Sequence, residues 1–112
     1  MSTFPETRMR RLRRTKGIRN MLGIGLPEPE KFLWPVFVVE GRGKSVPIKT
    51  MPGQSRLSSD RLCLALEPLA ADGLGGILLF GVVEDRRKDP KGTYACHEKG
   101  PVHQAVREVR RH

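Results

Sequence analysis

Two short, unbroken runs of apolar residues dominate the hydropathy pattern of the chain. The strands that they predict cover residues 33–40 and 76–83, and each is rich in Val, Leu and Phe and contains Gly or Pro. Runs of this length and composition are typical of strands buried on both faces, which belong to parallel sheets. A sheet of two such strands cannot cover both of its faces by itself, so the pattern predicts that neighbours are needed.

A helical pattern follows each of these strands. Residues 59–72 carry leucines at spacings of four and three, with Ser58 or Ser59 as the cap and Gly73 as a left-handed end (Leu62, Leu66 and Leu69). Residues 101–112 begin with Pro and carry valines at the same spacings (Val102, Val106 and Val109). Alternating strands and helices predict an α/β fold. No helix stop and no third strand follow, so we expect a chain cut off inside a repeating β/α pattern.

The segment between the first strand and the first long helix is expected to be a loop. Residues 41–57 contain Gly and Pro at short intervals, which prevents regular structure. Within this loop, residues 51–54 have Pro followed by Gly53, the pattern of a type II turn. Loops of this length after a parallel strand are commonly functional. Residues 84–92 are expected to form a second loop, charged and on the surface.

Charge divides the chain into a basic arm, residues 1–31, and a folded part, residues 32–112. The 112 residues carry a formal net charge of +9, and the arm holds eight Lys or Arg against three Glu. A short helix is expected over residues 15–22, before a linker rich in Gly and Pro. Such an arm seeks a negative partner, which can be nucleic acid, a membrane surface or an acidic protein face.

Composition indicates one small globular domain in a reducing compartment. Hydrophobic residues make up 38% of the chain and charged residues 29%, which argues against disorder. The two cysteines, Cys63 and Cys96, make no disulfide framework. No apolar run reaches membrane-spanning length, and the N-terminus lacks the apolar core of a signal peptide. We therefore expect a cytoplasmic protein with no membrane partner, although an Arg-rich N-terminus is also typical of a transit peptide.

Few residues have the spacing that metal or phosphate chemistry requires. Cys96, His97 and His103 are soft donors, but their spacing matches no zinc pattern and a fourth ligand is missing. We interpret them as surface residues. Residues 41–45 resemble a phosphate-binding loop only in composition and lack the G-x-x-x-x-G-K-[ST] spacing.

Two further side chains have both a chemical and a structural interpretation. Glu40 ends the first strand, where barrel enzymes keep catalytic groups, and is therefore a candidate carboxylate. We favour the alternative, in which Glu40 pairs with an arginine of a neighbouring segment. Cys63 lies on a helix whose other face is leucine, which favours a buried, inert thiol.

The arginines of the arm also have two interpretations. Their charge fits nucleic acid, but no aromatic residue interleaves with them to stack on bases, which disfavours that partner. The alternative is an oligomer arm whose guanidinium groups pair with carboxylates of another subunit.

Four blocks of sequence together carry a family resemblance. They are Arg8-Met9-Arg10-Arg11-Leu12-Arg13, Leu33-Trp34-Pro35-Val36-Phe37-Val38-Val39-Glu40-Gly41, Met51-Pro52-Gly53 with Arg56-Leu57-Ser58 shortly after, and Leu79-Phe80-Gly81-Val82. In order and spacing these blocks resemble the N-terminal third of porphobilinogen synthase, also called delta-aminolevulinic acid dehydratase. The resemblance extends over essentially the whole chain.

The resemblance implies a TIM (β/α)8 barrel, of which this chain would supply an N-terminal arm and the first two β/α units. Members of that family typically assemble as octamers through an arm that embraces a neighbouring subunit. This implies oligomer contacts for the arginines of the arm (Arg8, Arg10, Arg11, Arg13 and Arg14). Family members condense two 5-aminolevulinate molecules into porphobilinogen on the route to haem, and they use zinc or magnesium.

The resemblance implies no catalytic, cofactor-binding or metal-binding residue in this chain. The two active-site lysines of the family, one of which forms a Schiff base, lie on later strands. Its zinc-binding cysteines, or the acidic residues that replace them, also follow the second helix. The lysines expected in loops of this chain lack the buried pocket that Schiff-base chemistry needs (Lys44, Lys49, Lys88, Lys91 and Lys99).

We therefore expect a truncated chain that is inactive alone and binds 5-aminolevulinate only within a complete barrel. Its open strand edges predict poor solubility, self-association, or docking onto a full-length or complementary barrel chain. Two alternatives remain: a small basic nucleic-acid-binding protein, and a regulatory pseudo-subunit that inserts its arm into full-length assemblies.

Overall fold

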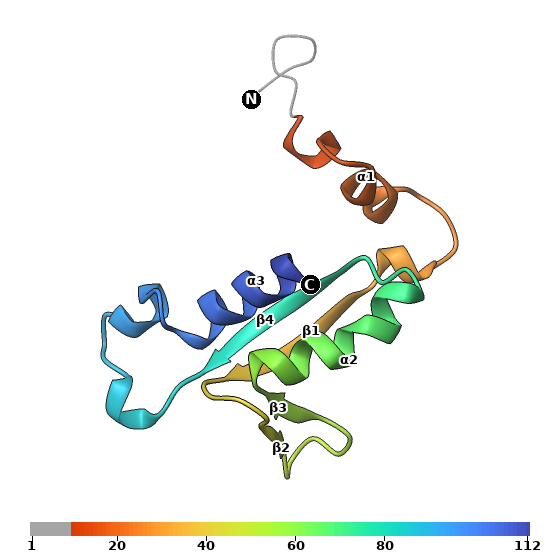
Figure 1. Ribbon diagram of the computed structural model, residues 1–112. Helices are drawn as coiled ribbons and strands as arrows, with labels where there is room; N and C mark the ends of the chain where they lie inside the picture. Colours follow the sequence, from red (N-terminus) through yellow and green to blue (C-terminus); the bar gives the residue numbers. More distant parts are fainter. Residues whose placement is uncertain (1–9) are drawn as a thin grey trace.

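An open four-stranded sheet forms the centre of the computed structural model, which describes residues 10–112 (Figure 1). Its strands lie in the order β2-β3-β1-β4 and comprise β1 (Leu33–Val39), β2 (Ser45–Pro47), β3 (Ser55–Leu57) and β4 (Gly76–Val82). β1 runs parallel to β3 and to β4, whereas β2 and β3 pair antiparallel. The fold is therefore α/β with a mixed sheet, and β1 and β4 each end one residue before the predicted boundary.

The prediction that residues 41–57 lack regular structure is wrong, because they contain β2 and β3. These strands have three residues each, and their pairing places Val46 opposite Arg56. Pro47 is tolerated because β2 is an edge strand. The predicted turn is confirmed: Gly53 has a φ of 81°, and the Gln54 N–H donates to the Met51 carbonyl at 3.0 Å.

Two helices, α2 (Ser59–Ala71) and α3 (Pro101–Arg111), cover one face of the sheet. Successive strand residues point to opposite faces, so the even-numbered residues of β1 lie beneath these helices. Val36, Val38, Leu62 and Ala105 form the core, and none of them is more than 3% exposed. Partly buried side chains pack around them (Trp34, Leu57, Leu79, Val102 and Val109).

The predicted apolar face of α3 is partly wrong. Val102 and Val109 pack against the core, but Val106 is 42% exposed and Ala105 is fully buried. The reason is geometric, since positions 102, 105 and 109 lie along one side of the helix while position 106 is turned away from it. The left-handed end predicted for α2 is confirmed at Gly73, which has a φ of 87°.

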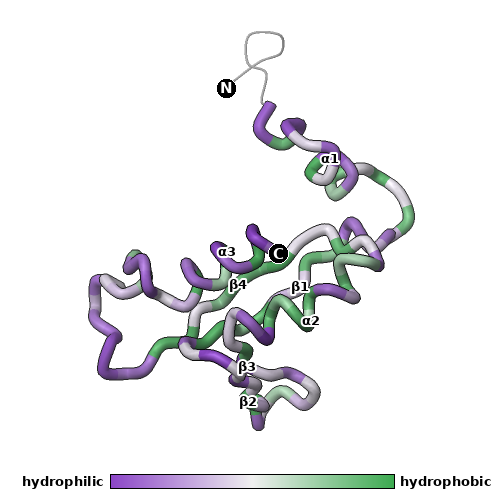
Figure 2. Tube along the Cα trace, in the orientation of Figure 1, coloured by the Kyte–Doolittle hydropathy of each residue, from purple (hydrophilic) through white to green (hydrophobic). Residues whose placement is uncertain are grey.

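The opposite face of the sheet is covered by neither α2 nor α3, and Met21 of the arm approaches it at the amino end of β4, where its Cε would lie 3.8 Å from a Cβ placed at Gly76. Phe37 and Phe80 pack there with ring centroids 5.5 Å apart. Leu33, Leu78 and Phe80 nevertheless remain 44–50% exposed. Figure 2 shows the apolar colouring that runs along β1 and β4. Within residues 10–112 the two strands are thus buried on one face and not on both, which agrees with the prediction that such a sheet needs neighbours. We call the other the bare face.

The described part of the arm, residues 10–31, lies beyond the amino ends of β1 and β4 (Figure 1). It contains two 3-10 turns, η1 (Arg11–Arg13) and η2 (Pro29–Lys31), on either side of the helix α1 (Lys16–Leu22). The Asn20 amide donates to the Glu30 carboxylate at 3.1 Å and ties α1 to η2. Gly75 passes so close to η2 that a Cβ there would lie 2.0 Å from the Glu30 carbonyl oxygen. The predicted contact residue Arg8 lies outside the described residues.

Candidate functional site at the carboxyl ends of the strands

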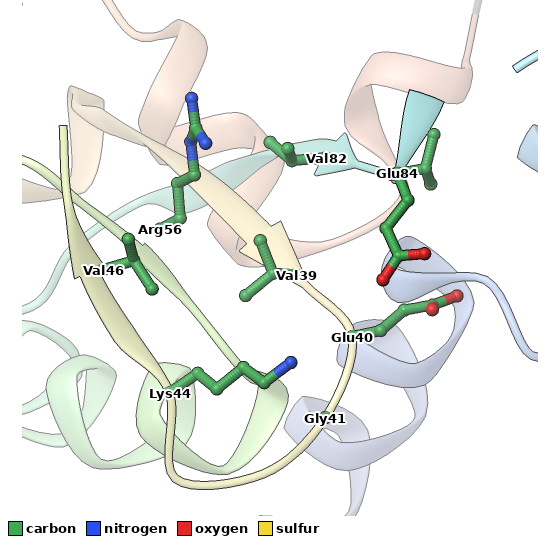
Figure 3. Close-up of a pocket in the computed structure, with 9 residues that line it drawn as sticks. Val39, Glu40, Gly41, Lys44, Val46, Arg56, Val82 and Glu84 are labelled. Carbon is green, nitrogen blue, oxygen red and sulfur yellow. The ribbon is translucent and has the colours of Figure 1, made fainter. Parts of the chain in front are cut away.

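A cavity of about 530 Å³ lies where the parallel strands end (Figure 3). Parallel strands point their carboxyl ends toward one edge of a sheet, so the loops that follow β1 and β4 meet there. The lining residues come from these ends and from the β2–β3 hairpin (Val39, Glu40, Gly41, Lys44, Val46, Arg56, Val82, Val83 and Glu84).

The floor of the cavity is apolar and continues the bare face. Val39 and Val82 are register partners on β1 and β4, and both lie on the bare face. Val46 of β2 lies on the same face. It is the register partner of Arg56, and Arg56 is the register partner of Phe37, which lies on the bare face. The cavity therefore opens where the bare face meets the carboxyl edge of the sheet, and we call it the mouth.

Two cations reach this mouth. Figure 3 shows Lys44 extending from the start of β2 toward the end of β1. Its Cε would lie 2.8 Å from a Cβ placed at Gly41, whose φ of 106° also favours glycine. Across the part of the chain that the structure describes, neither Lys44 nor Arg56 forms an ion pair. Glu40 and Glu84 also line the mouth, so charged groups of both signs surround its apolar floor.

Glu40 is held by residues from the segment after β4. Its carboxylate accepts a hydrogen bond from Arg87 Nη1 at 3.0 Å and another from the Tyr94 hydroxyl. The favoured interpretation, that Glu40 pairs with an arginine, is therefore confirmed. The hydrogen bond to Glu40, followed by burial, raises the pKa of Tyr94. Sequence reasoning missed Tyr94, and the only signal was a single aromatic residue in a charged segment.

Residues 41–45 use their backbone donors inside the protein. The Gly43 N–H donates to both carboxylate oxygens of Asp60, at 2.9 and 3.2 Å. Ser58 precedes α2, but its hydroxyl donates to Asp60 Oδ1 at 2.6 Å instead of capping the helix. These bonds, first from Ser58 and then from Gly43, lower the pKa of Asp60. The Gly43 N–H thus already bonds to a carboxylate of the protein.

The soft donors of the sequence do not converge on a point. Within residues 10–112, no group of three or more His, Cys, Asp or Glu is arranged to hold a metal ion, so zinc or magnesium does not fit the residues present. His97 instead stacks on Tyr94, with ring centroids 5.2 Å apart. Cys63 is 8% exposed, and burial raises the pKa of its thiol, whereas Cys96 is exposed.

The described helices, all of them between residues 10 and 112, are too short or too polar to cross a membrane. The sheet and its cavity together define an α/β protein of the kind that places ligands at the carboxyl ends of parallel strands.

Comparison with known proteins gives the family. The family model for delta-aminolevulinic acid dehydratase matches residues 6–112, and this chain belongs to that family. A delta-aminolevulinic acid dehydratase of Streptomyces coelicolor is 41% identical over 108 residues, which are 96% of this chain and 33% of the relative. One from Mycobacterium tuberculosis is 36% identical over 109 residues, 97% of this chain and 33% of the relative.

A solved structure has the same fold over the matched region. The delta-aminolevulinic acid dehydratase (porphobilinogen synthase) of Toxoplasma gondii, crystallised with the reaction product porphobilinogen, superposes with a TM-score of 0.71 at 30% identity. The match covers 94% of this chain and 30% of that chain. This chain therefore spans about a third of the length of the relatives it matches.

Proposed function

We propose that this chain is the N-terminal portion of a porphobilinogen synthase and has no dehydratase activity by itself. It would supply the basic arm and the first two β/α units of a TIM barrel. The observation that carries this proposal is the bare face, where Leu33, Leu78 and Phe80 are 44–50% exposed. In a barrel of this kind such side chains form the packed interior.

One edge of the sheet supports the same proposal. β4 pairs with β1 on one side and with no described strand on the other. An apolar edge strand of this kind is a template for a further strand. A complete barrel takes roughly 250 residues, so the larger part would come from elsewhere. The further strand would pair in parallel with β4 and begin to cover the bare face.

The chemistry would also come from the missing part. Lys44, which lines the mouth, is exposed, as are the other four lysines expected in loops. A Schiff-base lysine requires a desolvated amine, which an exposed side chain does not provide. We propose that this chain contributes walls to a site for 5-aminolevulinate, in the cytoplasm, and that the nucleophile lies in the remainder of the barrel.

The activity test compares the chain alone with a complemented barrel. Purified chain incubated with 5-aminolevulinate should form no porphobilinogen. Co-expression with the Streptomyces coelicolor relative lacking its matched N-terminal third should give a stable complex that forms porphobilinogen. Turnover by the chain alone would show that the inactivity proposal is wrong.

Charged variants separate barrel completion from non-specific association. Phe80→Lys on the bare face should abolish the complex, whereas Leu64→Lys, at a 56% exposed position on the outer side of α2, should not. If the chain is a monodisperse monomer that does not bind the complementary chain, the proposal that it is a portion of a barrel is wrong. If both variants reduce complex formation equally, the bare face is not the surface that binds the complementary chain.

We also propose that the arm contacts another subunit, either a second copy or a full-length chain. The described arginines of the cluster, Arg10, Arg11, Arg13 and Arg14, are all exposed and suited to pair with carboxylates. Changing these four to Gln should reduce the assembly size measured by analytical ultracentrifugation. A matched set of helix arginines serves as the control (Arg61, Arg107, Arg110 and Arg111). An unchanged assembly size would contradict this role.

The alternative function, nucleic-acid binding, is favoured by the net charge of +9. If it holds, affinity should fall steeply with salt and exceed that of an arginine-rich peptide of equal charge. The regulatory pseudo-subunit predicts something different, namely co-purification with a full-length synthase from the same cell.

A further inference from the structure

The segment of residues 84–97 lies beside the cavity mouth and is unusually polar. It contains two 3-10 turns, η3 (Asp85–Arg87) and η4 (Thr93–Cys96), and most of its residues are exposed. Few apolar contacts can hold such a segment in place, so its position must depend on specific polar contacts.

Most polar contacts of the segment are local. Glu84 pairs with Arg86, and Lys88 pairs with Asp85 at 2.6 Å. Asp89 accepts from the backbone N–H groups of Lys91 and Thr93. These bonds shape the turns, but they fasten the segment to nothing else.

Among the side-chain hydrogen bonds described for this segment, those that reach the sheet converge on Glu40. Arg87 and Tyr94 lie 47 and 54 residues away in the sequence, and both donate to Glu40 Oε1. Arg87 also donates to the Tyr94 hydroxyl, and its guanidinium carbon lies 4.7 Å from the Tyr94 ring centroid. Each member of the trio therefore contacts the other two.

We infer that Glu40, Arg87 and Tyr94 form a clasp that fastens residues 84–97 to the carboxyl end of β1, with Glu40 as a positioning residue. The side chains of Glu40 and Arg87 are 28% and 37% exposed, so water screens the pair only in part. The raised pKa of Tyr94 agrees with a phenol that donates to a carboxylate. This inference concerns the chain itself and does not rest on the proposed function.

The clasp stands between two cavities. Glu40 lines the mouth described above, while Arg87 and Tyr94 line a second cavity of about 400 Å³. The floor of the second cavity comes from the end of β4 and the start of α3 (Gly81, Val83, Pro101 and Val102). Holding the clasp closed therefore fixes the wall that the two cavities share.

The composition of the chain provides a direct test, because Tyr94 is its single tyrosine. In an alkaline titration followed by tyrosinate absorbance, the folded chain should ionise above the ordinary pKa of about 10. Glu40→Gln should bring the midpoint back toward about 10, whereas the matched variant Glu84→Gln should leave it raised. Far-UV circular dichroism shows that each variant is folded, and the titration in urea gives the reference.

Hydrogen exchange tests the fastening itself. Glu40→Gln and Tyr94→Phe should each speed amide exchange in residues 84–97 by about ten-fold, the scale of one charge-assisted hydrogen bond, and Glu84→Gln should not. A folded wild-type chain whose Tyr94 titrates as in urea would overturn the clasp. Unchanged exchange in both clasp variants would overturn it as well.

Discussion

The two faces of the sheet are formed by the same strands but differ in burial. On one face Val36 and Val38 are almost completely buried beneath α2 and α3. On the other, Leu78 and Phe80 keep nearly half of their surface exposed. The residues themselves are equally apolar, so what differs is whether residues 10–112 provide a cover. The apolar pattern of a strand thus predicts that a face will be covered, but it does not show which chain covers it.

The largest expected effect lies on the covered face. Leu62→Ala should lower the free energy of unfolding by about 2–5 kcal/mol, because it opens a cavity beside Val38 in a fully buried position. Urea unfolding followed by the fluorescence of the single tryptophan, Trp34, measures this loss. Leu64→Ala, on the same helix but 56% exposed, should change it by less than about 0.5 kcal/mol. Equal losses would show that α2 does not pack on the sheet as described.

The two thiols extend the comparison to reactivity. Cys63 lies within the covered layer, and burial raises its pKa, so the nucleophilic thiolate is scarce and hard to reach. Exposed Cys96 should react with a disulfide reagent about 100-fold faster or more. Time-resolved labelling with mass spectrometry resolves the two rates. Similar rates in the folded chain would mean that the covered face opens readily.

The amino end of α2 should respond to pH through Asp60. Hydrogen bonds from Ser58 and Gly43 lower its pKa below 3.8 in the folded chain. A depressed pKa stabilises the fold above about pH 4, and this contribution is lost as the pH falls through the folded value. Asp60→Asn should therefore lose less stability than the wild type between pH 7 and pH 3, as measured by urea unfolding. A slope in Asp60→Asn equal to that of the wild type would contradict this role of Asp60.

The smallest effect on stability is expected on the bare face. Leu78→Gln should change the free energy of unfolding by less than about 0.5 kcal/mol, because its side chain is already 48% exposed. The same change should reduce self-association in sedimentation velocity. Leu79→Gln is the matched control, since Leu79 packs against the core and its substitution should destabilise the chain. A large loss in Leu78→Gln would show that the bare face is covered after all.

The sequence predicted the elements whose pattern is long and apolar. The observed β1, β4, α2 and α3 fall within one residue of their expected ranges at each end. β2 and β3 were missed because three residues are too few for a periodic signal, and the pairing of β3 with β1 is a tertiary effect. The turn at residues 51–54 was the available clue, since a tight turn between short polar segments is typical of a hairpin.

The candidate site was less predictable because its contacts are distant in sequence. The position of Glu40 at a strand end identified the region, and pairing with an arginine was expected. Arg87 and Tyr94 bond to Glu40 because the charged segment after β4 folds back toward the end of β1. The hydropathy pattern does not predict that path. The prediction that Val106 lies on the buried side of α3 was wrong for a similar reason, because packing determines which side of α3 contacts the sheet.

The close approach of Gly75 to Glu30 has a mechanical consequence. No side chain separates the two backbones there, and the Gly75 N–H donates to the Pro29 carbonyl at 3.2 Å, so the arm is held directly against the sheet. This contact lies at the amino ends of the strands, whereas Glu40 and the mouth lie at the carboxyl end of β1. A load placed on the arm by a neighbouring molecule would therefore enter the sheet at the edge opposite the mouth.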